Sequence, residues 1–266
     1  MLKQRILTAL VLLPLMLLML LAAGSVLWAA FAALITLLAL WEYARICAFT
    51  AKQQLVYVAG TALFMLTAYV GDWMLPAFVW LAVLLFWLAA VPLWLHKKWA
   101  LRGAGVRTAA VGWLVLLPFW YALLMLRPQG GGVAELLAVM ALVWLADVAA
   151  YFCGRKWGRH KLAPAISPGK SWEGVAGALA AVVPYVAVVY GCGWFGSGLS
   201  WGGAMLLALL LTALSVAGDL FESWLKRTAG VKDSSNLLPG HGGVLDRIDG
   251  LAAVLAVYAA FSVWFS

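Results

Sequence analysis

The chain has 266 residues, of which 66% are hydrophobic and 11% are charged, and its formal net charge is +8. Soluble domains are roughly 45–50% apolar, so this composition excludes an ordinary soluble globular protein. An apolar run of about 20 residues crosses a bilayer as a helix, whereas an open-edged sheet would leave backbone groups unpaired. We therefore predict an all-α fold, a polytopic bundle of transmembrane helices.

Nine apolar runs in the chain are candidates for membrane spans. They cover residues 6–23, 26–43, 55–70, 74–95, 108–126, 133–152, 175–190, 201–218 and 251–265. The first run follows two basic residues and ends in small residues, which is also typical of a signal peptide. Its length favours an uncleaved helix, so we expect about nine spans.

The basic residues gather in alternate connections. Every Lys and Arg except Arg127 precedes the first run or follows the second, fourth, sixth or eighth run. An excess of Lys and Arg marks the cytoplasmic side. We therefore predict an integral protein of the plasma (bacterial inner) membrane with its N-terminus cytoplasmic and its C-terminus outside. The basic face can meet anionic membrane lipids and phosphorylated substrates, and without a soluble domain we expect no nucleic-acid partner.

The segment between the last two runs, residues 223–249, concentrates much of the charge of the chain. Asp219 lies just before it, and Ser223 and Lys226 follow at helical spacings of four and three residues. A carboxylate, a hydroxyl and an amine are thus expected on one helix face. A carboxylate inside or at the end of a span needs an explanation, since at a helix centre it costs about 2.5–3.5 kcal/mol on insertion scales. Because the three groups align where the chain leaves the membrane, we expect Asp219 to be functional.

Two further carboxylates close this segment. Asp246 and Asp249 are one helical turn apart, with Arg247 projecting elsewhere. Together with Asp219 they are candidates to hold Mg²⁺, which prefers a few carboxylates plus substrate phosphate oxygens. Asp147, inside the sixth run, is either a weaker metal candidate or half of a buried ion pair.

Two loops carry groups suited to phosphates. The turn at 239–243 is rich in glycine, so its backbone amides can approach a phosphate, and His241 either donates to that phosphate or shapes the loop. The loop at 154–174 offers Ser167 and Lys170 in a compact turn before a new helix. It lacks the spacing of a Walker A loop. Taken alone, each loop would be an ordinary connection.

Together these motifs resemble those of the phosphatidate cytidylyltransferases, also called CDP-diacylglycerol synthases. The family pattern reads Ser, two residues, Lys-Arg, four residues, Lys-Asp, a turn, His-Gly-Gly and Asp-Arg-x-Asp. The chain fills the pattern with Ser223, Lys226, Arg227, Lys232, Asp233, His241, Gly242, Gly243, Asp246, Arg247 and Asp249. The resemblance covers the whole chain. It divides the chain into N-terminal transmembrane helices, 1–130, and a C-terminal transmembrane catalytic region, 131–266.

The resemblance implies a reaction at the cytoplasmic side in phospholipid biosynthesis. CTP and phosphatidic acid would give CDP-diacylglycerol and pyrophosphate, with Mg²⁺ required. The residues suit this reaction independently, because nucleotidyl transfer depends on in-line positioning and neutralisation of charge. A phosphate monoester is already largely anionic at neutral pH, so no strong general base is needed.

The site hypothesis assigns three roles. The expected metal ligands are Asp219, Asp246 and Asp249, with Asp147 in weaker support. The expected catalytic groups are Asp219, Lys226, Arg227, Asp246 and Arg247. The expected substrate-binding groups are Ser167, Lys170, Ser223, Lys232, Asp233, His241, Gly242 and Gly243.

Two other functions stay open at this point. A CTP-dependent polyprenol or dolichol kinase would transfer the γ-phosphate to a lipid alcohol, would need a base, and would release CDP. An ion-coupled transporter would relay ions through Asp147 and Asp219, but the clustering of charge on one face disfavours it. The sequence also leaves open a second, monovalent cation, a homodimer, the acyl-chain preference and the route by which the lipid reaches the site.

Overall fold

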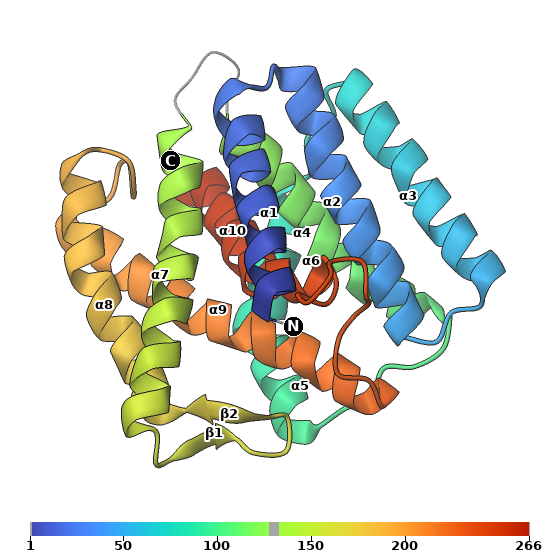
Figure 1. Cartoon of the computed structure of the whole chain (residues 1–266). Coiled ribbons are helices and arrows are strands. Elements are labelled where there is room, and N and C mark those ends of the chain that lie inside the picture. The colour runs from blue at the N-terminus through green and yellow to red at the C-terminus, as the bar shows by residue number, and fades with distance from the viewer. Residues whose placement is uncertain (1, 128–132, 266) are drawn as a thin grey trace.

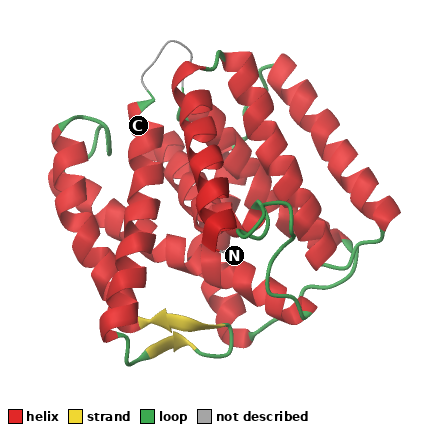
Figure 2. Ribbon diagram, in the orientation of Figure 1, coloured by secondary structure: helices red, strands yellow, loops and turns green. Residues whose placement is uncertain are grey.

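The fold is a bundle of helices with one small hairpin (Figures 1 and 2). The computed structural model describes residues 2–265 except 128–132, so the expected division between 130 and 131 lies outside the described residues. The elements in chain order are α1 (Leu2–Ala22), α2 (Ser25–Ile46), α3 (Ala51–Val70), α4 (Ala77–Leu85), the π-helical turn η1 (Phe86–Ala90), α5 (Val91–Lys97), α6 (Val106–Met125), α7 (Ala134–Trp157), β1 (Lys161–Ala163), β2 (Ser167–Ser171), α8 (Trp172–Gly191), α9 (Trp201–Ala229) and α10 (Leu245–Phe265).

The predicted spans fall on these helices. In the described residues, eight helical stretches are long and apolar enough to cross a membrane: α2, α3, the continuous run from α4 to α5, and α6 to α10. The described part of α1 adds a shorter apolar helix, Leu10–Ala22. The prediction of an all-α polytopic membrane fold is therefore confirmed.

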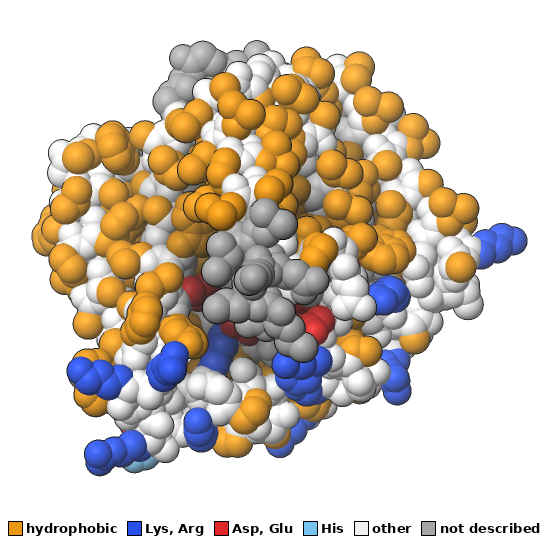
Figure 3. All heavy atoms as spheres, in the orientation of Figure 1, with side chains coloured by type: hydrophobic (Ala, Val, Ile, Leu, Met, Phe, Trp, Pro, Cys, Tyr) orange, Lys and Arg blue, Asp and Glu red, His pale blue; other side chains and the backbone are white. Residues whose placement is uncertain are grey.

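Charge lies at one end of the bundle. Figure 3 shows Lys and Arg side chains gathered along the lower part of the molecule, under a surface that is otherwise mostly hydrophobic. In the same orientation the β1–β2 hairpin, α5 and the last turns of α9 occupy that end (Figure 1). We call it the basic end.

One expectation about the polar segments needs correction, whereas the helical spacing expected for Asp219, Ser223 and Lys226 is confirmed. The compact turn expected at Ser167 to Lys170 is strand β2, which pairs antiparallel with β1. Helix α9 continues past residue 218 to Ala229 and ends at Gly230 in the left-handed conformation, with φ of 74°, as is common for glycine after a helix. Hydropathy marks where apolar residues end, and a helix can continue beyond that point. The charged residues of α9 and α10 therefore stand on rigid helices.

Glycines set the distance between α9 and α10. A Cβ atom on Gly218 would overlap the carbonyl oxygen of Asp249, and one on Gly250 would press on the backbone of Ser215. Small residues allow helices in membranes to approach closely. This contact brings Asp219, the neighbour of Gly218, beside the turn of α10 that carries Asp249.

We predict that Gly218→Ala destabilises the protein by about 1–3 kcal/mol, because the added methyl group has no space at the helix crossing. Thermal unfolding in detergent, followed by tryptophan fluorescence, measures the effect. Gly60→Ala in α3 is the matched control, since a Cβ there meets nothing within 4 Å and alanine favours a helix. Equal unfolding temperatures for Gly218→Ala and the unchanged protein would contradict the packing argument.

Candidate active site

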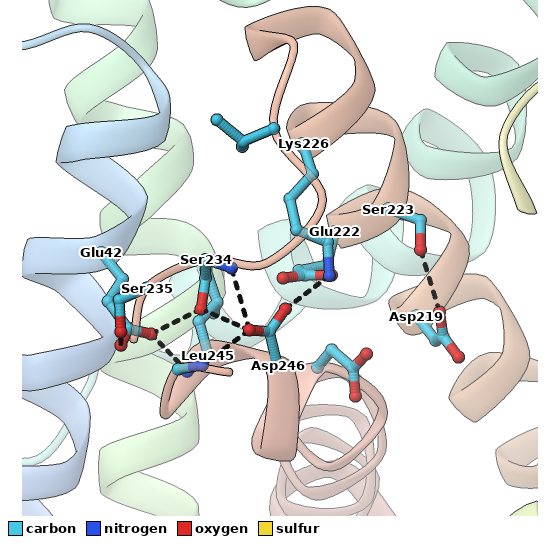
Figure 4. A network of polar contacts seen from close by, with 12 residues as sticks. Glu42, Asp219, Glu222, Ser223, Lys226, Ser234, Ser235, Leu245 and Asp246 are labelled. Atoms are coloured by element: carbon cyan, nitrogen blue, oxygen red, sulfur yellow. Dashed lines mark hydrogen bonds and ion pairs between the residues drawn. The ribbon is translucent and has the colours of Figure 1, made fainter. Parts of the chain in front are cut away.

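A buried carboxylate of α2 holds the beginning of α10. Glu42 is 0% exposed and accepts hydrogen bonds from the backbone amides of Val244 at 3.0 Å and Leu245 at 2.6 Å. The hydroxyls of Ser234 and Ser235 donate to the same carboxylate at 2.9 Å and 2.5 Å (Figure 4). Glu42 thereby supplies an acceptor for helix amides that have no partner within the helix, and a negative charge where the helix dipole favours one.

The loop before α10 is fitted closely to this carboxylate. A Cβ atom on Gly243 would collide with the Glu42 carboxylate and the Ser234 hydroxyl, so only glycine fits there. Arg45 of α2 donates to the carbonyl oxygen of Ser234. Helix α2 therefore holds the loop before α10 through two side chains, the carboxylate of Glu42 and the guanidinium of Arg45.

Asp246 lies in the first turn of α10 and is fully engaged by its neighbours. Its Oδ1 atom is 2.5 Å from Nζ of Lys226, and Oδ2 accepts from the Ser234 amide at 2.9 Å and from the Gly243 amide at 2.7 Å. The Ser234 hydroxyl lies 2.9 Å from Oδ2 and 2.9 Å from the Glu42 carboxylate, and the two carboxylates share its single hydrogen. Lys226 also forms an ion pair with Glu222, one turn earlier on α9. The Glu222, Lys226 and Asp246 side chains are only 5%, 10% and 5% exposed. Burial makes such a network stabilising only while every member is paired.

A second cluster surrounds Asp219. Lys170 of β2 places Nζ 2.6 Å from Oδ2 of Asp219, and the Ser223 hydroxyl donates to Oδ1 at 3.2 Å. Asp249 and Asp147 lie close enough for their charges to interact with those of Asp219 and Lys170. The Asp219 side chain is 34% exposed, and Figure 4 shows it apart from the network around Asp246. This cluster brings three carboxyl groups near one ammonium.

The expected metal trio is not assembled at one point. In the part of the chain that the structure describes, no group of three or more His, Cys, Asp or Glu side chains is arranged to hold a metal ion. Both carboxylate oxygens of Asp246 are bound by protein donors and are not free to bind a metal ion. Mg²⁺ is commonly bound by one or two carboxylates, with water and substrate phosphates completing its shell. Asp219 and Asp249 fit that mode, and Asp147 is near enough to support them.

The remaining predicted groups lie around these clusters. Arg227 donates to the carbonyl oxygens of Ile166 at 3.2 Å and Val231 at 3.3 Å, so it ties the β1–β2 hairpin to the end of α9. Ser167 is half-buried on β2. The exposed groups are Lys232, Asp233 and Arg247.

The predicted glycine turn has the expected shape but fewer free amides. Gly240 and Gly242 have φ of 78° and 81°, in the left-handed region that glycine favours. The His241 amide donates to Leu238 at 2.8 Å, and the Gly243 amide is taken by Asp246. Buried Nδ1 of His241 has no hydrogen-bond partner among the described residues. The expected phosphate cradle therefore lacks the His241 and Gly243 amides.

Four residues of the site were missed by sequence reasoning: Glu42, Glu222, Ser234 and Ser235. Two signals were available, because Glu42 is an acid inside an apolar run and Glu222 stands one turn before Lys226. The two serines carried no such signal.

The described helices thus place buried carboxylates and lysines at the basic end of a bundle of candidate membrane spans. A model of the cytidylyltransferase family matches residues 3–265. The chain is 44% identical to a phosphatidate cytidylyltransferase of Pseudomonas aeruginosa over 98% of this chain and 96% of that protein. Matches of 46% and 40% identity to proteins of the same name from Haemophilus influenzae and Mycobacterium leprae cover 55% and 59% of this chain and 54% and 49% of those proteins. The chain therefore belongs to the cytidylyltransferase family, and the resemblance seen in its motifs is confirmed.

We predict that Glu42→Gln loosens the start of α10. The amide cannot accept all four hydrogen bonds, and each buried donor left without an acceptor costs about 1–3 kcal/mol. Hydrogen exchange followed by mass spectrometry should show faster exchange at Val244 and Leu245, together with a lower unfolding temperature.

Thr36→Val provides the control for this prediction. Thr36 is equally buried on α2, and its hydroxyl donates to Ala32 within the same helix at 2.8 Å. Exchange at Val244 and Leu245 should stay unchanged in that variant. Unchanged exchange in Glu42→Gln as well would show that the carboxylate does not hold α10.

Proposed function

We propose that this protein transfers the cytidylyl group of CTP to phosphatidic acid, giving CDP-diacylglycerol and pyrophosphate in phospholipid biosynthesis. The observation that carries the proposal is the cluster of Asp219, Asp249 and Lys170 at the basic end of a membrane bundle. A relative with 44% identity over nearly the full length is named for this activity. The nucleotidyltransferase is thus integral to the membrane in which its lipid substrate and product reside.

The residues supply positioning and charge. A phosphate oxygen of the lipid attacks the α-phosphorus of CTP, a new P–O bond forms, and the bond to the bridging oxygen breaks as pyrophosphate leaves. The ammonium of Lys170, which pairs with Asp219, and the guanidinium of Arg247, whose charge acts on Asp147, are the cations that would hold phosphates. Because the attacking phosphate is already anionic, the reaction needs orientation more than a base.

Magnesium completes this proposal. Bound by Asp219 and Asp249 with substrate oxygens, Mg²⁺ would neutralise charge on the triphosphate and stabilise the leaving pyrophosphate. Asp147 would support that pair. A second, monovalent cation and a homodimer stay predictions.

The buried network has a different role in the proposal. Lys226 is held between Glu222 and Asp246, so it positions the loop and α10 and is not free for a phosphate. Asp246 likewise orients the loop that contains His241 and Gly242. These residues keep the reacting groups of α9 and α10 in register.

We expect Asp219→Asn to lower CTP-dependent formation of CDP-diacylglycerol by about 100-fold or more and to raise the Mg²⁺ concentration needed for half-maximal rate. Asp246→Asn should lower the rate without changing the Mg²⁺ dependence, because it acts on loop position. Detergent-purified variants are assayed with labelled CTP and phosphatidic acid across a Mg²⁺ titration.

Lys156→Gln serves as control for loss of a charge at the basic end, since Lys156 lies over Trp157 on the surface. Wild-type rate and Mg²⁺ dependence in Asp219→Asn would contradict the metal proposal. Release of CDP instead of pyrophosphate would show that the protein is a CTP-dependent lipid kinase and not a cytidylyltransferase.

The native cysteines test the proposed orientation, with the N-terminus cytoplasmic and the C-terminus outside. Cys192, after α8, is exposed, and Cys153 of α7 is half-buried. Burial raises the pKa of the Cys47 thiol to about 12, so that thiol carries little of the reactive thiolate. In a Cys153→Ser variant, a membrane-impermeant maleimide should label Cys192 from outside intact cells. Added Cys192→Ala should abolish labelling, and labelling only after permeabilisation would show the reverse orientation.

A further inference from the structure

A cavity of about 590 Å³ lies among the ends of α1, α2, α3 and α6. These ends are in the upper part of Figure 1, opposite the basic end. The cavity has the size of a small-molecule site, and the proposed reaction does not use it. The residues of its wall that matter here are Trp28, Tyr69, Asp72, Trp73, Trp120 and Arg127.

Arg127 places a fixed positive charge in the wall of this cavity. Its Nε atom donates to the carbonyl oxygen of Leu20 at 2.8 Å, and Nη2 donates to that of Ala23 at 2.5 Å. The guanidinium lies over the Trp28 ring at 5.0 Å, where a cation–π attraction holds it. No carboxylate of the described residues forms an ion pair with it. The distribution of basic residues does not explain this arginine, because it is the one outside the basic connections.

Asp72 adds a negative charge to the same cavity. It stands in the turn after α3 with φ of 52°, and within the described chain it is likewise in no ion pair, with Arg127 or any other group. Two opposite charges therefore line one cavity without forming an ion pair with each other. A ligand that carries both an anionic and a cationic group would pair with both.

Trp120 lines the cavity and carries an unused donor. The residue is 1% exposed, and its Nε1–H group has no acceptor among the described residues. A buried donor without a partner costs about 1–3 kcal/mol, so a ligand oxygen placed there would recover that energy. The cavity also opens toward the surface of the bundle, because Leu21, Trp73 and Met74 of its wall are 60%, 54% and 64% exposed.

We propose that this cavity binds the head group of a zwitterionic phospholipid with a primary ammonium, of the ethanolamine type. Its phosphate pairs with Arg127, its ammonium pairs with Asp72 beside the faces of the tryptophans, and a phosphate or ester oxygen accepts from Trp120. The acyl chains leave through the open side, along the apolar surface. The site is separate from the one that holds Asp219.

Lipid binding to the delipidated full-length protein tests the proposal. Phosphatidylethanolamine, phosphatidylglycerol and phosphatidylcholine are titrated in detergent, and binding is measured by native mass spectrometry and by the rise in unfolding temperature that a ligand produces. Phosphatidylethanolamine should bind tightest, because its ammonium both carries a positive charge and donates hydrogen bonds to Asp72. The choline ammonium has no N–H group, and the glycerol head group has no positive charge. Arg127→Gln should weaken phosphatidylethanolamine and phosphatidylglycerol, whereas Asp72→Asn should weaken phosphatidylethanolamine alone, each by about ten-fold.

Trp120→Phe removes the donor, keeps most of the ring and leaves Arg127 in place, so it reports on the site even where Arg127→Gln fails to fold. It should weaken phosphatidylethanolamine binding several-fold. If phosphatidylglycerol and phosphatidylethanolamine bind equally well, and Asp72→Asn changes neither affinity, the site binds anionic lipids and the proposal is overturned. Binding that no variant changes would also overturn it. Because the readout is binding, the outcome is independent of the cytidylyl transfer.

Discussion

The carboxylate of Glu42 is the contact on which the polar part of this membrane protein depends. A charged group buried away from water is tolerated only when hydrogen bonds replace its hydration. Glu42 meets that condition with four donors, two from amides at the start of α10 and two from hydroxyls of the preceding loop. The same bonds satisfy amides that a helix end leaves without partners. These hydrogen bonds thus compensate the lost hydration of both the Glu42 carboxylate and the helix amides, and they attach the C-terminal polar segment to α2.

Helix α10, once fastened, meets α9 in a register that sorts the carboxylates. The two helices touch at Gly218 and Gly250, so Asp219 of α9 falls beside the turn of Asp249. One turn further toward the basic end, Glu222 and Lys226 of α9 face Asp246. Asp219, beside Asp249, keeps 34% of its side chain exposed. The network of Glu222, Lys226 and Asp246 is instead covered by the loop that Glu42 holds. The three acids that the sequence predicted as one metal site therefore divide into two networks with different chemistry.

The sequence predicted what depends on local composition. Apolar runs locate the spans, and the cost of an acid in a span singled out Asp219. It could not predict the partners of Asp246, because spacing along a helix does not say which distant amides will converge on a carboxylate. Glu42 and Ser234 are 192 residues apart, and no local pattern links them. Strand β2 was missed since its Pro168 and Gly169 disfavour strands, and pairing with β1 overrides that preference.

The partners of the carboxylates differ between the network around Lys226 and the cluster around Lys170, and this difference explains why we expect a cation to bind only at the second. Around Lys226, one ammonium and several hydrogen-bond donors meet two carboxylates, and every oxygen of Asp246 has a partner. Around Lys170, one ammonium pairs with Asp219 and lies near two further carboxyl groups, and in the described chain Asp219 accepts a hydrogen bond from the Ser223 hydroxyl. A triphosphate approaching the second network alone would be repelled, and a divalent cation there alone would lack ligands for its full shell. The cation offsets the charge of the triphosphate, and the triphosphate supplies oxygen ligands to the cation. We therefore infer that nucleotide and metal bind together at Asp219 and Asp249.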